Sequence, residues 1–137
     1  MPIPEFELDV KKMPDLYDRV AFEIAKCFVG KDRRNKVVGV SKSQIRKIFD
    51  ETKALGRSLK DSDEEKWKEV YPLIKMIKVK TAYIYARASK ESRDYYKNLY
   101  DFITHAIDKV KNYNDFNTFN LLFEAVYGYY YGIGGKE

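Results

Sequence analysis

Apolar residues recur at the spacing of an α-helix along most of this chain. Between residues 14 and 131 they fall three or four positions apart in successive stretches, which puts them on one face of each helix. No stretch shows sustained two-residue alternation flanked by hairpin turns, the pattern of a half-buried strand. The 137 residues fit one domain with one core. The sequence therefore predicts an all-α fold, a single compact bundle of about five helices.

Capping residues predict where the helices begin. Ser41 and Ser62 are each followed three positions later by Gln44 or Glu65, the capping box in which side chains satisfy free N–H groups of the first turn. Pro72 predicts a kink or a restart in the third helix. The predicted helix starts are Pro14, Ser41, Ser62, Ser89 and either Asn114 or Asp115.

The segments outside the predicted helices are short. Residues 1–13 carry two early prolines and are expected to form an extended lead-in, and residues 132–137 a flexible, glycine-rich tail. Residues 30–40, which include two glycines, are predicted to form a basic loop. We find no repeat and no interdomain linker, so residues 1–137 are predicted to form one helical domain.

The last predicted helix is unusually aromatic. It carries Phe116, Phe119, Phe123, Val126 and Tyr130 on one side, with Tyr127 and Tyr131 near the edge of that side. A chain of this size cannot easily enclose all of them, and exposed apolar patches commonly mark protein contacts. We therefore expect copies of the chain to self-associate, as a possible homodimer, with the loop at 30–40 as the hinge of a domain swap.

The sequence offers no active site. Its only histidine is His105 and its only cysteine is Cys27, too few for a zinc site or an intramolecular disulfide. The acids between Asp61 and Glu65 fall in a predicted first helical turn and lack the spacing of a calcium loop. We therefore predict that the protein is not an enzyme and has no catalytic residue, no metal and no cofactor.

No apolar run is long enough to span a bilayer, and no charged-then-apolar leader is visible. The basic segments also lack the strongly apolar opposite face of a membrane-surface helix. The expected location is the cytoplasm, without a membrane partner.

Positive charge is concentrated in two stretches. Residues 26–47 contain eight basic residues and a single acid, Asp32, and residues 75–87 contain four basic residues and no acid. At about 100° per residue, Lys80, Tyr83 and Arg87 share one flank of the third helix, and Lys78 lies on the other border of the apolar stripe. Clustered cations beside an aromatic ring suit a nucleic-acid backbone and its bases. The alternative for each residue alone is a solvated lysine face.

Three segments, in this order, resemble the small subunit of the type III-A CRISPR–Cas effector, the Csm complex. The first is Ser-Lys-Ser-Gln-Ile-Arg-Lys-Ile-Phe at 41–49, a helix start of that family. The second is Lys-Val-Lys-Thr-Ala-Tyr-Ile-Tyr-Ala-Arg at 78–87, and the third is the closing helix around Phe123-Glu124-Ala125. Residues 1–40 carry no comparable signature.

The resemblance implies a non-catalytic subunit that covers the target RNA paired to the crRNA, beside the backbone and large subunits of the complex. Carried onto this chain, it implies sequence-independent RNA contacts at Lys42, Gln44, Arg46, Lys47, Lys78, Lys80 and Arg87. Arg33 and Arg34 in the basic loop are further RNA-binding candidates, with a merely solvated loop as the alternative. A helical DNA-binding protein and a purely structural adaptor stay open as other functions.

Overall fold

A computed structural model describes all 137 residues and confirms the predicted all-α bundle. A π-helical turn, Leu16–Val20, runs directly into α1, Ala21–Lys26. Two short strands follow, β1 at Val29–Lys31 and β2 at Val37–Gly39. The long helices are α2 (Lys42–Leu59), α3 (Glu64–Ala86), α4 (Arg93–Asp108) and α5 (Tyr113–Gly132), with a 3₁₀ turn, Lys90–Ser92, before α4.

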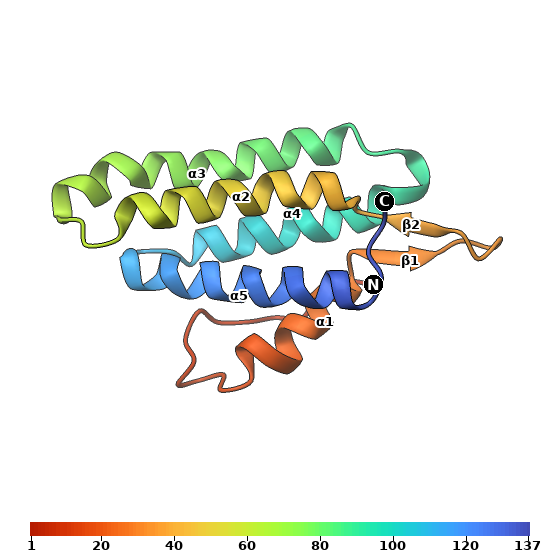
Figure 1. The fold of residues 1–137 in the computed structure, drawn as a ribbon, viewed down its shortest axis with the longest axis horizontal. Helices are drawn as coiled ribbons and strands as arrows, with labels where there is room; N and C mark the ends of the chain where they lie inside the picture. Colours follow the sequence, from red (N-terminus) through yellow and green to blue (C-terminus); the bar gives the residue numbers. More distant parts are fainter.

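The helices run side by side along the length of the molecule (Figure 1). α3 packs against α2 and α4, whereas α5 packs against α1 and α2. α3 therefore lies at one edge of the bundle and α1 at the other (Figure 1). Because no element covers the outer side of α3, one face of that helix is open to solvent. None of the helices combines the length and the apolar content that a bilayer-spanning segment needs.

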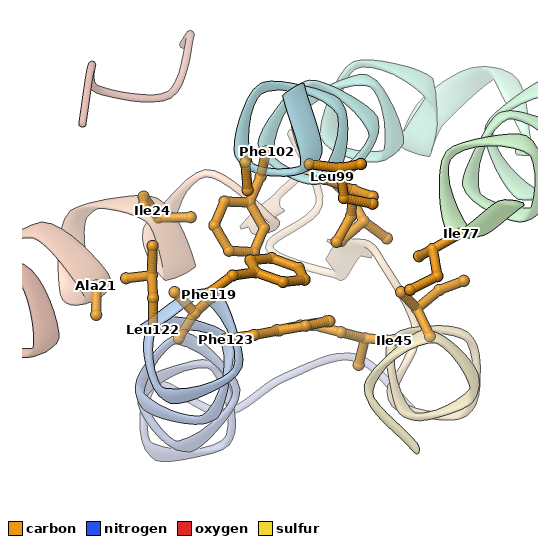
Figure 2. Close-up of a cluster of buried hydrophobic side chains, with 14 of the residues drawn as sticks. Ala21, Ile24, Ile45, Ile77, Leu99, Phe102, Phe119, Leu122 and Phe123 are labelled. Atoms are coloured by element: carbon orange, nitrogen blue, oxygen red, sulfur yellow. The ribbon is translucent and has the colours of Figure 1, made fainter. Parts of the chain in front are cut away.

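Phe102 of α4 lies at the centre of the core. Its ring lies within 5.6–6.1 Å, centroid to centroid, of those of Phe6, Phe28, Phe119 and Phe123. Figure 2 shows Phe119 and Phe123 pointing from α5 toward this ring, with apolar side chains of α1, α2 and α3 around them. The core therefore joins the lead-in and the helices α1, α2, α3 and α5 to α4.

The prediction that the last helix leaves some of its aromatic side chains exposed is confirmed only at its edge, where Tyr131 has 41% of its surface exposed. Phe116, Phe119, Phe123 and Tyr130 all have 0% of their surface exposed. The reason is that α5 is flanked by both α1 and α2, so neighbours close over its apolar face. The Tyr130 hydroxyl, which donates to the Val40 carbonyl, is buried enough to raise the pKa of this tyrosine to about 12. Tyr131 is therefore the one exposed tyrosine of this helix that supports the argument for self-association, and self-association itself stays a prediction.

The prediction that residues 30–40 form a loop without secondary structure is wrong. The segment forms an antiparallel hairpin in which Val29 pairs with Gly39 and Lys31 with Val37. Gly39 has a φ of +131°, and a Cβ there would lie 2.4 Å from the Phe28 carbonyl oxygen, so only glycine fits. Strands of three residues are too short to show a two-residue alternation, which is why the pattern did not reveal them.

The predicted helix starts are confirmed in part. Ser41 is the N-cap of α2, and its hydroxyl accepts from the Gln44 N–H at 3.3 Å. The reciprocal half of the capping box is absent, because the Ser41 N–H donates instead to the Tyr96 hydroxyl at 3.1 Å. The caps of α3 and α5 are Asp63 and Asn112, so the predictions of Ser62 and of Asn114 or Asp115 are off by one to three residues.

α3 continues through Pro72 as one helix, so the predicted restart does not occur. Pro72 lies in the exposed part of the third turn, where the helix faces solvent. A missing N–H costs least on such a face, because water can satisfy the carbonyl oxygen that loses its partner.

The C-terminal residues return to the start of α2. The Lys136 carbonyl accepts from the Lys42 N–H at 2.6 Å, and the Lys136 N–H donates to the Tyr130 hydroxyl at 3.1 Å. This places the last residues beside the first turn of α2, where one of the free N–H groups of that turn is satisfied by the chain itself. The proposed division into lead-in, domain and tail stays a prediction.

Candidate nucleic-acid interface

A groove of about 840 Å³ runs between the first half of α2 and the last half of α3. Residues of the turn that joins α3 to α4, and Lys136 of the returning C-terminal segment, also line it. Its lining combines charged, polar and apolar side chains: Gly39, Gln44, Lys47, Ile48, Glu51, Val79, Lys80, Tyr83, Ile84, Arg87, Ala88, Ser89, Ser92, Tyr96 and Lys136. In Figure 1 these segments lie at the end of the bundle from which the β-hairpin projects.

Helical spacing explains which side chains reach the groove. On α2, Gln44, Lys47 and Glu51 are three and four positions apart, so they follow one another along one face. On α3, Lys80 and Arg87 lie two turns apart on the same face. The buried Ile77 and Thr81, on the adjacent side of α3, face the bundle. The predicted flank of Lys80, Tyr83 and Arg87 is therefore brought together as expected.

The groove is strongly positive. Four cations line it, Lys47, Lys80, Arg87 and Lys136, against one carboxylate, Glu51. Glu51 on α2 forms an ion pair with Lys80 on α3, which bridges the two walls. The other three cations have no ion-pair partner. The excess charge is therefore available to an anion that enters the groove.

An exposed tyrosine stands at the rim of the groove. The ring of Tyr83 is 59% exposed, and the Arg87 guanidinium lies 5.4 Å from its centroid. An Arg87 Nη1–H also donates to the Tyr83 hydroxyl at 2.7 Å. This contact holds an aromatic plane next to a cation, a combination that can contact a base and its phosphate together.

Other predicted site residues lie outside the groove. Lys42 pairs with Glu137 at 2.6 Å and sits 5.2 Å from the centroid of the Tyr131 ring on α5. Arg46 lies 3.6 Å from Asp50, in an exposed pair on the surface of α2. Neither residue lines the groove, because each is rotated about 100° or more along α2 from the residues that do.

Lys78 faces α4. Its ammonium group donates to Asp108 at 2.6 Å, and this hydrogen bond lowers the pKa of the Asp108 carboxyl. Arg33 and Arg34 are exposed at the turn of the β-hairpin, where the Asp32 carboxylate accepts from the Arg34 N–H. Of the nine predicted RNA contacts, four therefore line one groove: Gln44, Lys47, Lys80 and Arg87.

Two charged groove residues, Glu51 and Lys136, were missed from the sequence. Glu51 could have been found, because it lies seven positions after Gln44 and so shares its helical face. Lys136 had no local signal, because only the return of the C-terminal residues to α2 brings it there. No three potential metal ligands cluster anywhere in the molecule.

The bundle and the groove define a small basic helical protein, and the excess of cations in the groove between α2 and α3 suits a polyanionic partner. A family model described as Csm2 Type III-A matches residues 9–136, nearly the whole chain. The chain therefore belongs to this family, the small subunits of the type III-A Csm complex. No curated protein and no solved structure matches it significantly. The matched range begins well before residue 41, so it includes the first helix and the hairpin, for which the sequence segments had no signature.

Proposed function

We propose that the chain is a non-catalytic small subunit that binds RNA in the Csm complex, through the groove between α2 and α3. Its partners would be the target RNA paired to the crRNA and the adjoining backbone and large subunits. The single observation that carries this proposal is that cations from both walls, Lys47 on α2 and Lys80 and Arg87 on α3, face one groove. The chain belongs to a family of subunits of the Csm complex, and in that complex RNA is the polyanion that we expect this groove to bind.

The chemistry of the groove supports contact with the RNA backbone rather than with base edges. Lysine is a point charge that attracts phosphate in any sequence, and Arg87 is already engaged with Tyr83. A guide-programmed complex needs such contacts, because base pairing to the crRNA supplies the sequence reading. We therefore infer binding without sequence preference.

Lys47 and Arg46 provide a matched pair of substitutions, because they are adjacent on α2 and only Lys47 lines the groove. We expect K47E to weaken binding of single-stranded RNA about tenfold, since a lost phosphate contact and a new repulsion together are worth roughly 1.4 kcal/mol. R46E should weaken binding by less than about threefold, because Arg46 sits outside the groove beside Asp50. The measurement is fluorescence anisotropy of a labelled oligoribonucleotide at fixed salt.

Equal losses in the two variants would refute the groove as the site and would favour a diffuse attraction. Tighter binding of duplex DNA than of RNA, weakened by K47E, would favour the alternative function of a DNA-binding protein. Two results together would favour the structural adaptor. The free chain would bind neither RNA nor DNA, and K47E would leave the retention of nucleic acid by the assembled complex unchanged.

The proposed role is binding and not catalysis. His105 lies exposed on α4, away from the groove, and Cys27 is buried, where desolvation raises the pKa of its thiol and keeps it protonated. We expect labelled RNA and DNA to stay intact after incubation with the purified protein and Mg²⁺, Mn²⁺ or Zn²⁺, as gel electrophoresis would show. Cleavage that co-elutes with the protein and is lost in H105A would contradict this. Location in the cytoplasm stays a prediction.

A further inference from the structure

The β-hairpin carries four basic side chains that have no acidic partner. Lys31, Arg33, Arg34 and Lys36 are exposed, and none of them forms an ion pair. The hairpin projects beyond the end of the helical bundle (Figure 1). None of the four side chains lines the groove between α2 and α3, so the groove does not account for them.

The only acid of the hairpin, Asp32, is used by the turn itself. Its carboxylate accepts from the backbone N–H groups of Arg34 at 2.8 Å and Lys36 at 3.0 Å. Asn35 completes the turn with a φ of +65°, a conformation that asparagine adopts more readily than most residues. Asp32 therefore holds the backbone of the turn in one shape, and the cations on either side of it stay available to a ligand.

The base of the hairpin is anchored to the bundle. The Gly39 N–H donates to the Ser92 hydroxyl at 2.9 Å, in the turn before α4. Val38 is buried, and a Cβ at Gly30 would lie 2.2 Å from the Tyr95 hydroxyl oxygen, so the strands pack closely against the start of α4. An arm that is already ordered in this way loses little conformational freedom when it binds a partner.

The charge of the molecule changes sign along α2 and α3. Residues 60–69, at the turn between these helices, contain three bases and five acids, a net charge of −2. Residues 29–40, the hairpin, contain four bases and one acid, a net charge of +3. The two segments lie at opposite ends of the molecule (Figure 1). A polyanion that fills the groove is therefore drawn out of it toward the hairpin and not toward the turn between α2 and α3.

The C-terminal residues connect the groove to the hairpin. Lys136 lines the groove, and Gly135 beside it lines a second cavity, of about 440 Å³, together with Lys31 of β1. No acidic side chain lines this second cavity. Glu91 and Asp94 line a different cavity beside the hairpin, where they would repel a phosphate. The acid-free path from the groove therefore leads past Lys136 to the hairpin.

We propose that the hairpin is a preformed basic arm that binds the same RNA as the groove, on the stretch that leaves the groove past Lys136. Its ligand is the RNA backbone, with Arg33 and Arg34 on the phosphates. From Gly39, which lines the groove, to Arg34 the chain reaches at most about 17 Å, at roughly 3.3 Å per residue. This corresponds to about five nucleotides of a stacked strand, at roughly 3.4 Å each. The inference rests on the proposed function and adds a second contact to it, which tightens binding because it forms within a complex that already exists.

RNA length separates the two contacts. The groove wall from Gln44 to Glu51 extends about 10 Å, at roughly 1.5 Å per residue, so an RNA of about six nucleotides fills the groove, whereas one of about sixteen also covers the arm. We expect R33E/R34E to weaken binding of the longer RNA at least about tenfold in fluorescence anisotropy, and that of the shorter RNA less than about twofold. The control K11E/K60E makes the same change in charge at exposed lysines outside the groove and the hairpin. It should weaken binding of both RNAs by the same small factor.

Asp32 tests whether the shape of the arm matters in addition to its charge. D32N and D32A both remove the negative charge, but only the amide oxygen introduced by D32N can still accept from the N–H groups of the turn. We expect D32N to bind the longer RNA at least as tightly as the unmodified chain does, and D32A to bind it about fivefold more weakly than D32N. Equal binding by the two variants would overturn the preformed arm.

Other results would overturn the second contact itself. Equal losses for the two RNA lengths in R33E/R34E would show that the arm acts only through net charge. Loss of another subunit from the assembled complex in R33E/R34E, with RNA binding unchanged, would assign the hairpin to a protein contact. If K47E weakens binding of both RNAs and R33E/R34E weakens neither, the groove binds RNA and the arm is wrong. If R33E/R34E weakens binding of the longer RNA and K47E weakens neither, the hairpin binds RNA and the proposed groove is wrong.

Discussion

A variant carrying K47E, K80E and R87E is expected to bind single-stranded RNA on the order of 100-fold more weakly than the unmodified chain. Each substitution replaces a cation that lines the groove with an anion. This costs roughly 1.4 kcal/mol each at Lys47 and Arg87 and less at Lys80, which is already paired with Glu51, so the total is roughly 3 kcal/mol. The dependence of binding on salt should also flatten. Each lost contact lowers the slope of log K against log salt by about 0.7 for a single strand, so the slope should fall by about 2.

The matched control reverses the same number of charges elsewhere. Lys11, Lys60 and Lys68 are exposed and lie outside the groove, so K11E/K60E/K68E has the same net charge as the groove variant. Its affinity for RNA should fall only a few-fold at moderate salt, because it loses only a weak long-range attraction. If the two triple variants bind alike across a salt titration, net charge controls binding and the groove has no special role.

Replacing Phe102 with alanine is expected to lower the free energy of unfolding by about 4 kcal/mol. The ring has 0% of its surface exposed and contacts four other phenylalanine rings, so its loss leaves a cavity that the helices cannot close. For a chain of this length, that corresponds to a fall in melting temperature of roughly 12 °C. Denaturant unfolding followed by circular dichroism measures both the loss and the cooperativity.

Leu121→Ala is the control for this prediction, because Leu121 is an apolar residue of α5 with 41% of its surface exposed. Its replacement should change stability by no more than about 0.5 kcal/mol. A loss below roughly 1.5 kcal/mol for F102A would mean that the core repacks around the missing ring, and that the cluster in Figure 2 is not rigid.

The helical part of the fold could be predicted because each helix shows its buried face through several turns. Leu99, Ile103 and Phe119 were assigned to the core by spacing alone, and each is fully buried. The β-hairpin could not be predicted in the same way. Val38 is buried and Gly39 adopts a conformation that only glycine tolerates easily, but a three-residue strand contains too little pattern to separate it from a loop.

Short sequence motifs alone could not predict which residues of the candidate site line the groove. Arg46 and Lys47 are neighbours in one motif, yet a rotation of about 100° between them puts only Lys47 in the groove. Lys78 and Lys80 are about 160° apart around α3, and Lys78 pairs with Asp108 on α4. Helical angles had already separated Lys78 from Lys80 in the sequence, and the same angles applied to α2 would have separated Arg46 from Lys47. The exposed fraction of the α5 side chains could not be predicted from helical angles, because it depends on which helices pack beside α5.

The ion pair between Glu51 and Lys80 bears on how tightly such a groove ought to hold its partner. A phosphate that reaches Lys80 must displace a carboxylate that is already there, so the free chain begins below the affinity that its cations could reach. In a guide-programmed assembly, a tight hold on every RNA would retain mismatched transcripts as firmly as matched ones. A protein that binds any sequence preserves discrimination by binding weakly, and leaves the decision to stay or dissociate to the base pairs.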